Sequence, residues 1–383
     1  MHILIAALHR PSTPTGVCRF AANLARCLVD RGEISKITIA IGKWQDHYFE
    51  RLIETQSDKI ELVSIDIKNT SISRNLWFLF GLPKLAQQYQ VDRVHLSFPL
   101  PLIRSQFPCP VIATIHDLYP YQFPQNFGYK QALFNQLFLR QCINQSDALT
   151  CVSKTTLEAL NTYFPHIQKQ SKPTTVIYNF VDFSQVHTPP SLDFQKRFEF
   201  PFILCVAQHR KNKNIDLLIK TYDVLKSEKK INSETRLVIV GSPGPETEAL
   251  NILIQKKSLV SSIFMLSFID DRELCWLYQN CQLFVIPSSL EGFCIPLIEA
   301  LSFSCKVICS NIEIFKEIGA NDCTYFNLAG DALQNLSQAI HNILEEPISS
   351  KADVYLRFSK AKIADQYINF LLLTQFELAQ KEM

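Results

Sequence analysis

The sequence lacks a long hydrophobic run. No uninterrupted apolar stretch among its 383 residues approaches the ~20 residues that a membrane-spanning helix needs. The apolar run near the start, Ile3 to Leu8, has no basic segment before it and no small-residue cleavage site after it. We therefore expect neither a transmembrane helix nor a secretory signal, and we interpret this run as a buried first strand.

A strong excess of either charge is also absent. The chain has 38 Lys and Arg against 36 Asp and Glu, a formal net charge of +2. Nucleic-acid-binding proteins usually carry a clear basic excess, so this class is disfavoured. The hydrophobic fraction of 47% is typical of a globular protein. The length suits two domains of roughly 150–200 residues each.

The twelve cysteines include no CxxC pair, so the pattern gives no support for a zinc site. They are scattered, and most lie in apolar stretches, as small core residues do. Reduced thiols in a cytoplasmic protein explain them better than a disulfide framework. We expect a cytoplasmic location.

Internal repeats and low-complexity segments are absent as well. The first half of the chain alternates short apolar runs with amphipathic stretches. Continuous apolar strands separated by helices indicate a buried parallel sheet. Helical patterns cover residues 17–30 and 76–88. The expected strands are Ile3–Ala7, Ile37–Ile41, Ile60–Ile65, Arg93–Leu96, Val111–Thr114, Ala148–Val152 and Thr175–Tyr178.

The alternation stops at residues 183–200, which we interpret as a linker, and then restarts. We predict an α/β protein of two Rossmann-like doubly wound domains, residues 1–182 and 201–355, facing a central cleft. We expect residues 356–383 to form a closing helix. Ligands of such sheets bind beyond the carboxyl ends of the strands. The expected strands of the second half are Phe202–Ala207, Arg236–Val240, Ile263–Leu266, Leu283–Ile286 and Lys306–Cys309.

The expected strand at residues 283–286 is followed by a loop that contains Glu291 and then by an expected helix that contains Glu299. Pro296 suits the first turn of a helix, whose free N–H groups can hold a diphosphate. Gly292 would let a ligand approach the backbone. The carboxylates of Glu291 and Glu299 could accept hydrogen bonds from sugar hydroxyls. An ordinary helix start with acidic residues explains the pattern equally well.

The string from Glu291 to Ala300, EGFCIPLIEA, closely resembles the EGFGxPxxEA signature of the retaining glycosyltransferases of family 4, which have the GT-B fold. The resemblance implies that Glu291 lies near the donor sugar and that Glu299 binds the ribose hydroxyls. The backbone of Gly292, Phe293, Cys294 and Ile295 would hold the phosphates. Cys294 stands where the family usually has glycine.

Two motifs of the first half resemble the same family in the same order. Gly16 lies in PTGVCRF, which is similar to the family's N-terminal glycine-rich loop near donor or acceptor. His116 and Asp117 end an expected strand, where the family places the histidine that contacts the donor sugar. Asp117 would orient the loop or the histidine. A structural role is the usual alternative for a single histidine.

The basic loop after residues 202–207 resembles the segment with which the family holds the donor phosphates. Lys213 matches the family's lysine, whereas Gln208 occupies the usual arginine position, so Arg210 is a substitute candidate. Cations at this place can neutralise a diphosphate. Main chain around Phe268 would meet the nucleobase. Asn179 to Asp182 resembles the family's NGVD motif, with Phe180 for glycine, and we interpret it as structural.

Residues 73–89 and 129–140 mix Phe, Leu and Trp with Arg and Lys. Aromatic residues at helical spacing usually mark buried helix faces, and we adopt that interpretation. A face for peripheral contact with the inner membrane and a lipid-linked acceptor is the alternative.

The resemblance implies a retaining hexosyltransferase, with mannose a candidate sugar, that uses a nucleotide-diphosphate sugar and a glycan or lipid-linked acceptor in polysaccharide or glycoconjugate biosynthesis. Lys213, Arg210 and the helix start would stabilise the leaving diphosphate, so we expect no metal and no cofactor. Two alternatives remain open. They are a nucleotide-sugar epimerase, which needs no acceptor, and a non-catalytic sugar-nucleotide-binding or scaffold protein on the same fold.

Overall fold

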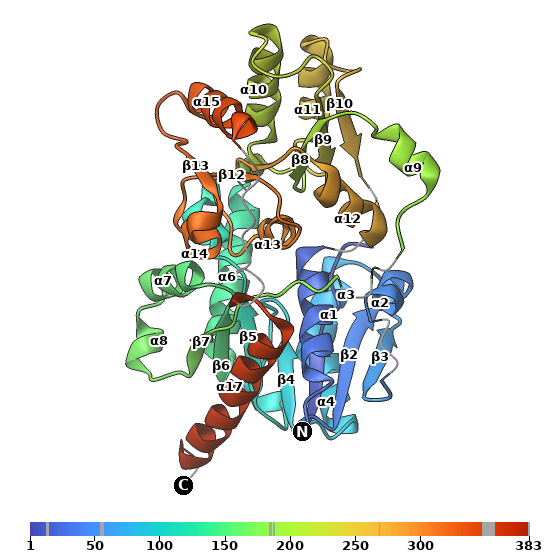
Figure 1. Cartoon of the computed structure of the whole chain (residues 1–383). Helices are drawn as coiled ribbons and strands as arrows, with labels where there is room; N and C mark the ends of the chain where they lie inside the picture. Colours follow the sequence, from blue (N-terminus) through green and yellow to red (C-terminus); the bar gives the residue numbers. More distant parts are fainter. Residues whose placement is uncertain are drawn as a thin grey trace. The chain divides into compact units, whose positions relative to one another are not determined.

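The structure is a computed structural model that describes residues 1–12, 15–53, 57–126, 128–183, 186, 188–267, 269–346 and 357–381. The chain divides into two compact units. The first unit combines Met1–Phe180 with Phe358–Met383, and the second is Val181–Arg357. Figure 1 shows the sheet and covering helices of each unit.

The first unit is built on a seven-stranded parallel sheet in the order β3-β2-β1-β4-β5-β6-β7. From β1 the strand order runs to one side through β2 and β3, and to the other side from β4 to β7. The topological switch point therefore lies between β1 and β4. The strands are β1 (His2–Ala6), β2 (Lys36–Gly42), β3 (Ile60–Ile65), β4 (Arg93–Leu96), β5 (Val111–Ile115), β6 (Ala148–Cys151) and β7 (Thr174–Val176).

Helices cover both faces of this sheet because its strands are apolar on both sides. Ile3 and Ile5 of β1 join one core cluster, whereas Leu4 and Ala6 join the other, as the two-residue period of a strand requires. The helices α1 (Gly16–Leu28), α2 (Asp46–Leu52) and α17 (Lys360–Lys381) pack on the first cluster. The second cluster is covered by α4 (Leu82–Gln88), α6 (Tyr129–Gln145) and α7 (Lys154–Tyr163).

Shorter elements connect these helices and strands. The segment before α4 consists of α3 (Ser71–Leu76) and a π-helical turn, η2 (Trp77–Gly81), so the single helix expected at residues 76–88 is interrupted. The other short helices of this unit are η1 (Lys43–Gln45), η3 (Arg104–Gln106), α5 (Tyr119–Gln122), η4 (Pro124–Asn126) and α8 (His166–Lys169).

The second unit has a six-stranded parallel sheet in the order β10-β9-β8-β11-β12-β13, with its switch point between β8 and β11. The strands are β8 (Phe202–Val206), β9 (Arg236–Val240), β10 (Ile263–Leu266), β11 (Leu283–Ile286), β12 (Val307–Ser310) and β13 (Thr324–Phe326). The helices are α9 (Leu192–Arg197), η5 (Lys211–Lys213), α10 (Ile215–Ser227), α11 (Thr247–Lys256), α12 (Asp271–Asn280), α13 (Ile295–Ser302), α14 (Glu313–Gly319), η6 (Ala320–Asp322) and α15 (Ala332–Glu345).

The prediction of two Rossmann-like parallel-sheet domains is confirmed. The segment expected to be an irregular linker differs from the expectation, because it contains α9. Phe194 of this helix packs edge-on against Trp276, and Phe198 packs against Phe264. Aromatic side chains therefore attach this part of the connection to the second unit.

The interpretation of residues 73–89 and 129–140 as buried faces is wrong for one side of each segment. Phe78, Leu82 and Leu139 are buried in the core. Leu133, Phe134, Leu137 and Phe138 of α6 are exposed, as are Ile72, Leu76 and Phe80 before α4. In each segment, the apolar side chains that face the sheet are buried as expected. A second set of apolar side chains, on the opposite side of the helix, faces outward.

The closing helix α17 is attached to the first unit by polar contacts. The hydroxyl of Tyr367 is hydrogen-bonded to Nδ1 of His95 in β4. Lys360 pairs with Asp30, and Asp365 pairs with Arg31, in the segment that follows α1. Among the described helices, none has the length and apolar content required to cross a bilayer. None of the twelve cysteines, all of which lie in described segments, is in a disulfide.

Candidate functional site

The candidate site of the second unit is formed by two loops that follow neighbouring strands. One loop, residues 207–214, follows β8, and the other, residues 287–294, follows β11. These strands pair in parallel at Leu283 with Ile203 and at Phe284 with Leu204. Both loops therefore leave the same edge of the sheet at its switch point, where a ligand is expected in such folds.

Asparagine side chains join the two loops. Asn212 donates from Nδ2 to the carbonyl oxygen of Leu290 at 3.0 Å, and its own carbonyl accepts from the amide of Ser289 at 2.8 Å. Asn214 donates to the carbonyl of Pro287 at 2.8 Å and adopts a left-handed backbone with φ of 48°. Asparagine tolerates this conformation better than most residues. The result is a fixed relative position for Lys213 and Glu291.

Lys213 and Glu291 form an ion pair with 2.5 Å between Nζ and Oε1, and their side chains are only 19% and 10% exposed. Burial opposes the charged amine, but the Glu291 carboxylate outweighs it, and the pKa of Lys213 is raised. Lysine has three N–H donors, so Nζ can bind Glu291 and a further anion together. Arg210 is exposed, and its charge acts on Lys213 in the opposite direction.

Glu299 is a buried carboxylate on α13. Its Oε2 accepts a hydrogen bond from the hydroxyl of Tyr278 in α12 at 2.8 Å. Burial, followed by the nearby Glu299 charge, raises the pKa of Tyr278, so the phenol stays protonated and remains a donor. A buried carboxylate is costly without such donors. Sequence reasoning missed Tyr278, because no local pattern connects it with a residue on another helix.

The turn into α13 contains a non-glycine residue in the left-handed region. Cys294 has φ of 71° and ψ of 75° and caps the helix through its backbone. Ile295 begins the helix, and Phe293 is buried beside it. Gly292 precedes them in the half-buried part of the loop. Pro296, in the first turn, has no N–H, and the amide of Leu297 donates to the carbonyl of Cys294 at 3.1 Å, so an anion would meet N–H groups that precede Pro296.

A third loop, residues 241–247 after β9, supports the first one. A Cβ on Gly241 would overlap the carbonyl of Ala207, and one on Gly244 would overlap the carbonyl of His209. His209 is buried and contacts the Thr247 hydroxyl through Nδ1 at 2.9 Å. Sequence reasoning missed this loop, although two glycines directly after an expected strand are a usable signal.

In the first unit, His116 directly follows β5. Its ring is held by the loop that follows the neighbouring strand, β4. Nε2 lies 2.7 Å from the carbonyl oxygen of Ser97, and the ring packs edge-on against Phe20 with centroids 4.9 Å apart. Burial lowers the pKa of His116, so the imidazole is neutral near pH 7. A carbonyl only accepts, so Nε2 carries the proton and Nδ1 is left as an acceptor.

Asp117 does not hold the His116 ring. Its Oδ1 accepts from the amide of Tyr119 at 3.0 Å, so it orders the turn into α5. Gly16 begins α1, and a Cβ there would meet no described atom within 4 Å. The fold itself therefore does not require glycine at this position.

A buried polar chain that sequence reasoning missed lies behind His116. Tyr367 is bonded to His95, His95 Nε2 lies 3.0 Å from Thr114 Oγ1, and Thr114 lies 2.7 Å from Thr150 Oγ1. Burial, and then the neighbouring His116, lower the pKa of His95 to about 3. Tyr367 thereby connects the closing helix with the strand that carries His116.

The remaining site predictions concern a nucleobase contact and metal ligands. Phe268, expected near a nucleobase, lies outside the described residues. Asp270 caps the helix that follows, with Glu273 completing a capping box. Within the described segments, no group of three or more His, Cys, Asp or Glu side chains has an arrangement that could hold a metal ion.

Two family models match consecutive parts of the chain. "Glycosyltransferase Family 4" matches residues 14–185, and "Glycosyl transferases group 1" matches residues 192–362. The O-antigen chain mannosyltransferase RfbU of Salmonella typhimurium is 26% identical over 343 residues, which are 87% of this chain and 88% of the relative. A Campylobacter jejuni 4-alpha-N-acetylgalactosaminyltransferase acting on a diphospho-undecaprenol substrate is 28% identical over 248 residues, 63% and 64% of the two chains.

Solved structures share the fold at low sequence identity. Sucrose-phosphate synthase from Thermosynechococcus elongatus superposes with a TM-score of 0.76 at 18% identity, over 99% of each chain. Anabaena HepE in complex with UDP and glucose gives a TM-score of 0.69 at 17% identity, over 97% of this chain and 99% of HepE. Both superpositions agree with the GT-B fold that the sequence resemblance implies.

Proposed function

Since the chain belongs to the group 1 glycosyl transferases and is a glycosyltransferase, we propose that it transfers a hexose from a nucleotide-diphosphate sugar with retention of configuration and without a metal. Mannose is the sugar we propose first, because several relatives are named mannosyltransferases. The proposed acceptor is a glycan or a lipid-linked glycan.

The observation that carries this proposal is the buried pair of Lys213 and Glu291 at the carboxyl edge of β8 and β11. Lys213 is held next to the loop that opens α13, so an ammonium group and helix N–H groups converge on one place. This combination suits a diphosphate better than a neutral ligand. Buried Glu299, on the same helix, is suited to accept hydrogen bonds from ribose hydroxyls.

In the proposed reaction, the bond between the sugar's C1 and the diphosphate oxygen breaks while an acceptor hydroxyl oxygen forms a bond to C1. The acceptor's proton passes to the departing phosphate oxygen. Negative charge grows on the diphosphate, and Lys213, Arg210 and the α13 amides stabilise it. These groups supply the charge that a divalent metal supplies in other transferases. Glu291 would orient the donor sugar.

We assign His116 a binding role rather than a proton-transfer role. Its lowered pKa makes the imidazolium scarce near neutral pH. The acceptor Nδ1 can receive a hydrogen bond from a hydroxyl of the donor sugar, while Ser97 fixes the ring. Gly16, which nothing in the fold requires, would allow a substrate to approach the start of α1.

The relatives named for O-antigen synthesis support a role in bacterial polysaccharide or glycoconjugate biosynthesis. One relative's name specifies an undecaprenol diphosphate substrate. We propose that this chain works in the cytoplasm, at the surface of the inner membrane, where an acceptor of that chemistry would be presented.

The experiment is a transfer assay with a panel of UDP- and GDP-sugars and a short-chain lipid-diphosphate acceptor, with and without EDTA. Transfer that persists in EDTA, with the donor's anomeric configuration kept in the product by NMR, is the expected result. An inverted product would overturn the retaining mechanism. Conversion of the donor sugar without any acceptor would favour an epimerase, and binding without turnover would favour a scaffold.

A further inference from the structure

The outward side of α6 is apolar, opposite the side that packs on the sheet. Ala132, Leu139 and Ile143 face the core. At 100° per residue, Leu133, Phe134, Leu137 and Phe138 fall on the opposite side of the helix, and Phe134 and Leu137 are 56% and 52% exposed. The rings of Phe134 and Phe138 stack with centroids 6.5 Å apart. A contiguous apolar stripe of this kind marks an interaction surface.

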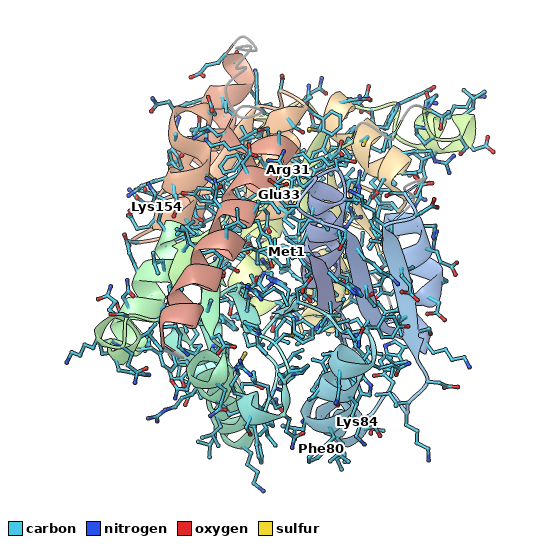
Figure 2. All side chains as sticks on the ribbon, turned by 90° about the horizontal axis from the view of Figure 1, so that it is seen from below. Met1, Arg31, Glu33, Phe80, Lys84 and Lys154 are labelled. Carbon is cyan, nitrogen blue, oxygen red and sulfur yellow. The ribbon has the colours of Figure 1, made fainter. Side chains whose placement is uncertain are left out.

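A second apolar stripe lies on the segment before α4. Ile72, Leu76 and Phe80 are exposed, Ile72 to 74%. This segment covers the same face of the seven-stranded sheet as α6, because Phe78 and Leu82 join the core cluster that contains Leu139. Figure 2 shows Phe80 and Lys84 side by side on the face opposite α17. We call these two stripes together the α3–α6 face.

The charged side chains of the two segments that carry the α3–α6 face have one sign. Residues 67–91 and 118–146 contain no Asp or Glu, although the whole chain has 36. Lys68, Lys84, Lys130 and Arg140 are exposed cations in these segments. Apolar side chains bordered by cations and free of carboxylates match the headgroup region of an anionic bilayer. A protein partner of ordinary composition would not require the complete exclusion of acidic residues.

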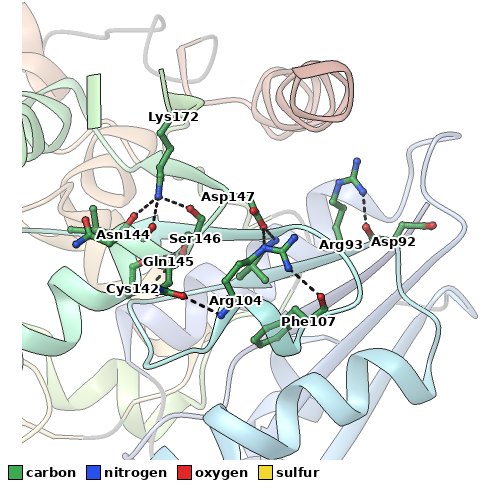
Figure 3. A network of polar contacts seen from close by, with 12 residues as sticks. Asp92, Arg93, Arg104, Phe107, Cys142, Asn144, Gln145, Ser146, Asp147 and Lys172 are labelled. Atoms are coloured by element: carbon green, nitrogen blue, oxygen red, sulfur yellow. Dashed lines mark hydrogen bonds and ion pairs between the residues drawn. The ribbon is translucent and has the colours of Figure 1, made fainter. Parts of the chain in front are cut away.

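The end of α6 is fixed to the body of the unit. Lys172 Nζ donates to the carbonyls of Ile143, Asn144 and Ser146 at 2.6–2.8 Å, which satisfies the last turn of the helix (Figure 3). Arg104 pairs with Asp147 at 2.6 Å, and Asp147 accepts from the amide of Val111 in β5. The apolar stripe of α6 is therefore presented by a rigid element attached to the strand that precedes His116.

We propose that the α3–α6 face docks the protein onto an anionic lipid bilayer, with Phe134, Leu137, Ile72 and Phe80 entering the interface and the four cations contacting lipid headgroups. This inference rests on the proposed function only in that a lipid-linked acceptor would lie in the same bilayer. It makes the first unit the membrane-facing part of the enzyme.

The test is flotation of the full chain with vesicles of phosphatidylcholine alone or with 30% phosphatidylglycerol, without any sugar substrate. The expected result is binding to the anionic vesicles only. Leu133→Ser/Leu137→Ser and Lys130→Glu/Arg140→Glu should each weaken it at least ten-fold. The matched control, Ile252→Ser/Val260→Ser, changes exposed apolar residues of the second unit and should bind like wild type.

Three outcomes would overturn the proposal. They are the absence of vesicle binding by wild type, equal binding by the α6 variants, and a concentration-dependent dimer in sedimentation velocity that the α6 variants abolish. The last outcome would assign the face to a second copy of the chain. Nucleotide binding, measured in the same variants by thermal shift, should be unchanged, so failure of the donor site would be seen separately.

Discussion

The ammonium of Lys213 and the carboxylate of Glu291 lie 2.5 Å apart, although 78 residues separate them in the sequence. They meet because β8 and β11 are neighbours at the point where the strand order changes direction. The hydrogen bonds of Asn212 and Asn214 keep the two loops in contact. Burying a charge pair costs desolvation free energy, so the pair adds little to stability. Its presence in these loops therefore supports a role in ligand binding.

Replacing Lys213 tests both roles of this pair. Lys213→Met leaves the Glu291 carboxylate without its partner and should lower the free energy of unfolding by about 3 kcal/mol. Lys213→Met/Glu291→Gln should recover most of that loss in urea unfolding, while both variants lose transferase activity. Lys316→Met, which breaks an exposed pair with Glu313, is the control and should cost less than about 0.5 kcal/mol. Full activity of Lys213→Met would contradict the account of the leaving group.

Removing the Tyr278 hydroxyl takes one donor from Glu299. Tyr278→Phe should cost about 1–3 kcal/mol of stability and should also weaken nucleotide binding, because the carboxylate is no longer held. Tyr222→Phe removes another buried hydroxyl of the second unit, one that donates to the carbonyl of Thr235. It should cost similar stability and leave the nucleotide dissociation constant unchanged in calorimetry. Equal nucleotide affinity in all three proteins would mean that Glu299 needs no positioning by Tyr278.

Cys294 occupies a backbone conformation that glycine adopts without strain. With φ of 71°, the cost of the Cβ is roughly 1–2 kcal/mol, and glycine's extra freedom in the unfolded chain offsets part of the gain. Cys294→Gly should therefore be more stable than Cys294→Ala by about 1 kcal/mol in urea unfolding, and it should retain nucleotide binding. An alanine variant that is the more stable of the two would show that this turn relaxes.

Stability should fall as the pH drops below about 6.5. The pKa of His95 is about 3 in the folded protein and about 6.5 in the unfolded chain, so between these values only the unfolded chain takes up this proton. One such group contributes a slope of up to about 1.4 kcal/mol per pH unit. The lowered pKa of His116 acts in the same direction.

Unfolding at pH 7.5, 6 and 5 measures this slope. His95→Asn should be less stable than wild type at pH 7.5, because Tyr367 and Thr114 lose their partner, yet it should lose less stability on acidification. An identical slope in the two proteins would assign the pH dependence to other groups.

The strands could be predicted because a strand buried on both faces is a short continuous apolar run. Five of them, at 60–65, 93–96, 236–240, 263–266 and 283–286, have the bounds that the sequence indicates. The three-residue β13 was missed because Thr324–Phe326 is too short for a pattern. The outward apolar side of α6 was interpreted as buried for another reason. A helical pattern of apolar residues does not tell whether each side of the helix packs against another element.

The sequence predicted those residues of the candidate site that come soon after the end of a strand. Lys213, Glu291 and His116 each lie after a strand, and the parallel sheet brings the first two together. Their other partners come from tertiary packing: Tyr278 reaches Glu299 from another helix, and Ser97 reaches His116 from a neighbouring loop. The same applies to Tyr367, which contacts His95 from 272 residues away.

The most direct test of the proposed donor site is thermal unfolding of wild type and Glu299→Gln with each of several nucleoside diphosphates and nucleotide sugars, in EDTA. A ligand at about 100 times its dissociation constant stabilises a protein by about 2.7 kcal/mol. The account predicts such a shift with the nucleotides of one base, and its loss in Glu299→Gln. No shift of the wild-type protein with any nucleotide would contradict the assignment of the donor site to the loops after β8 and β11.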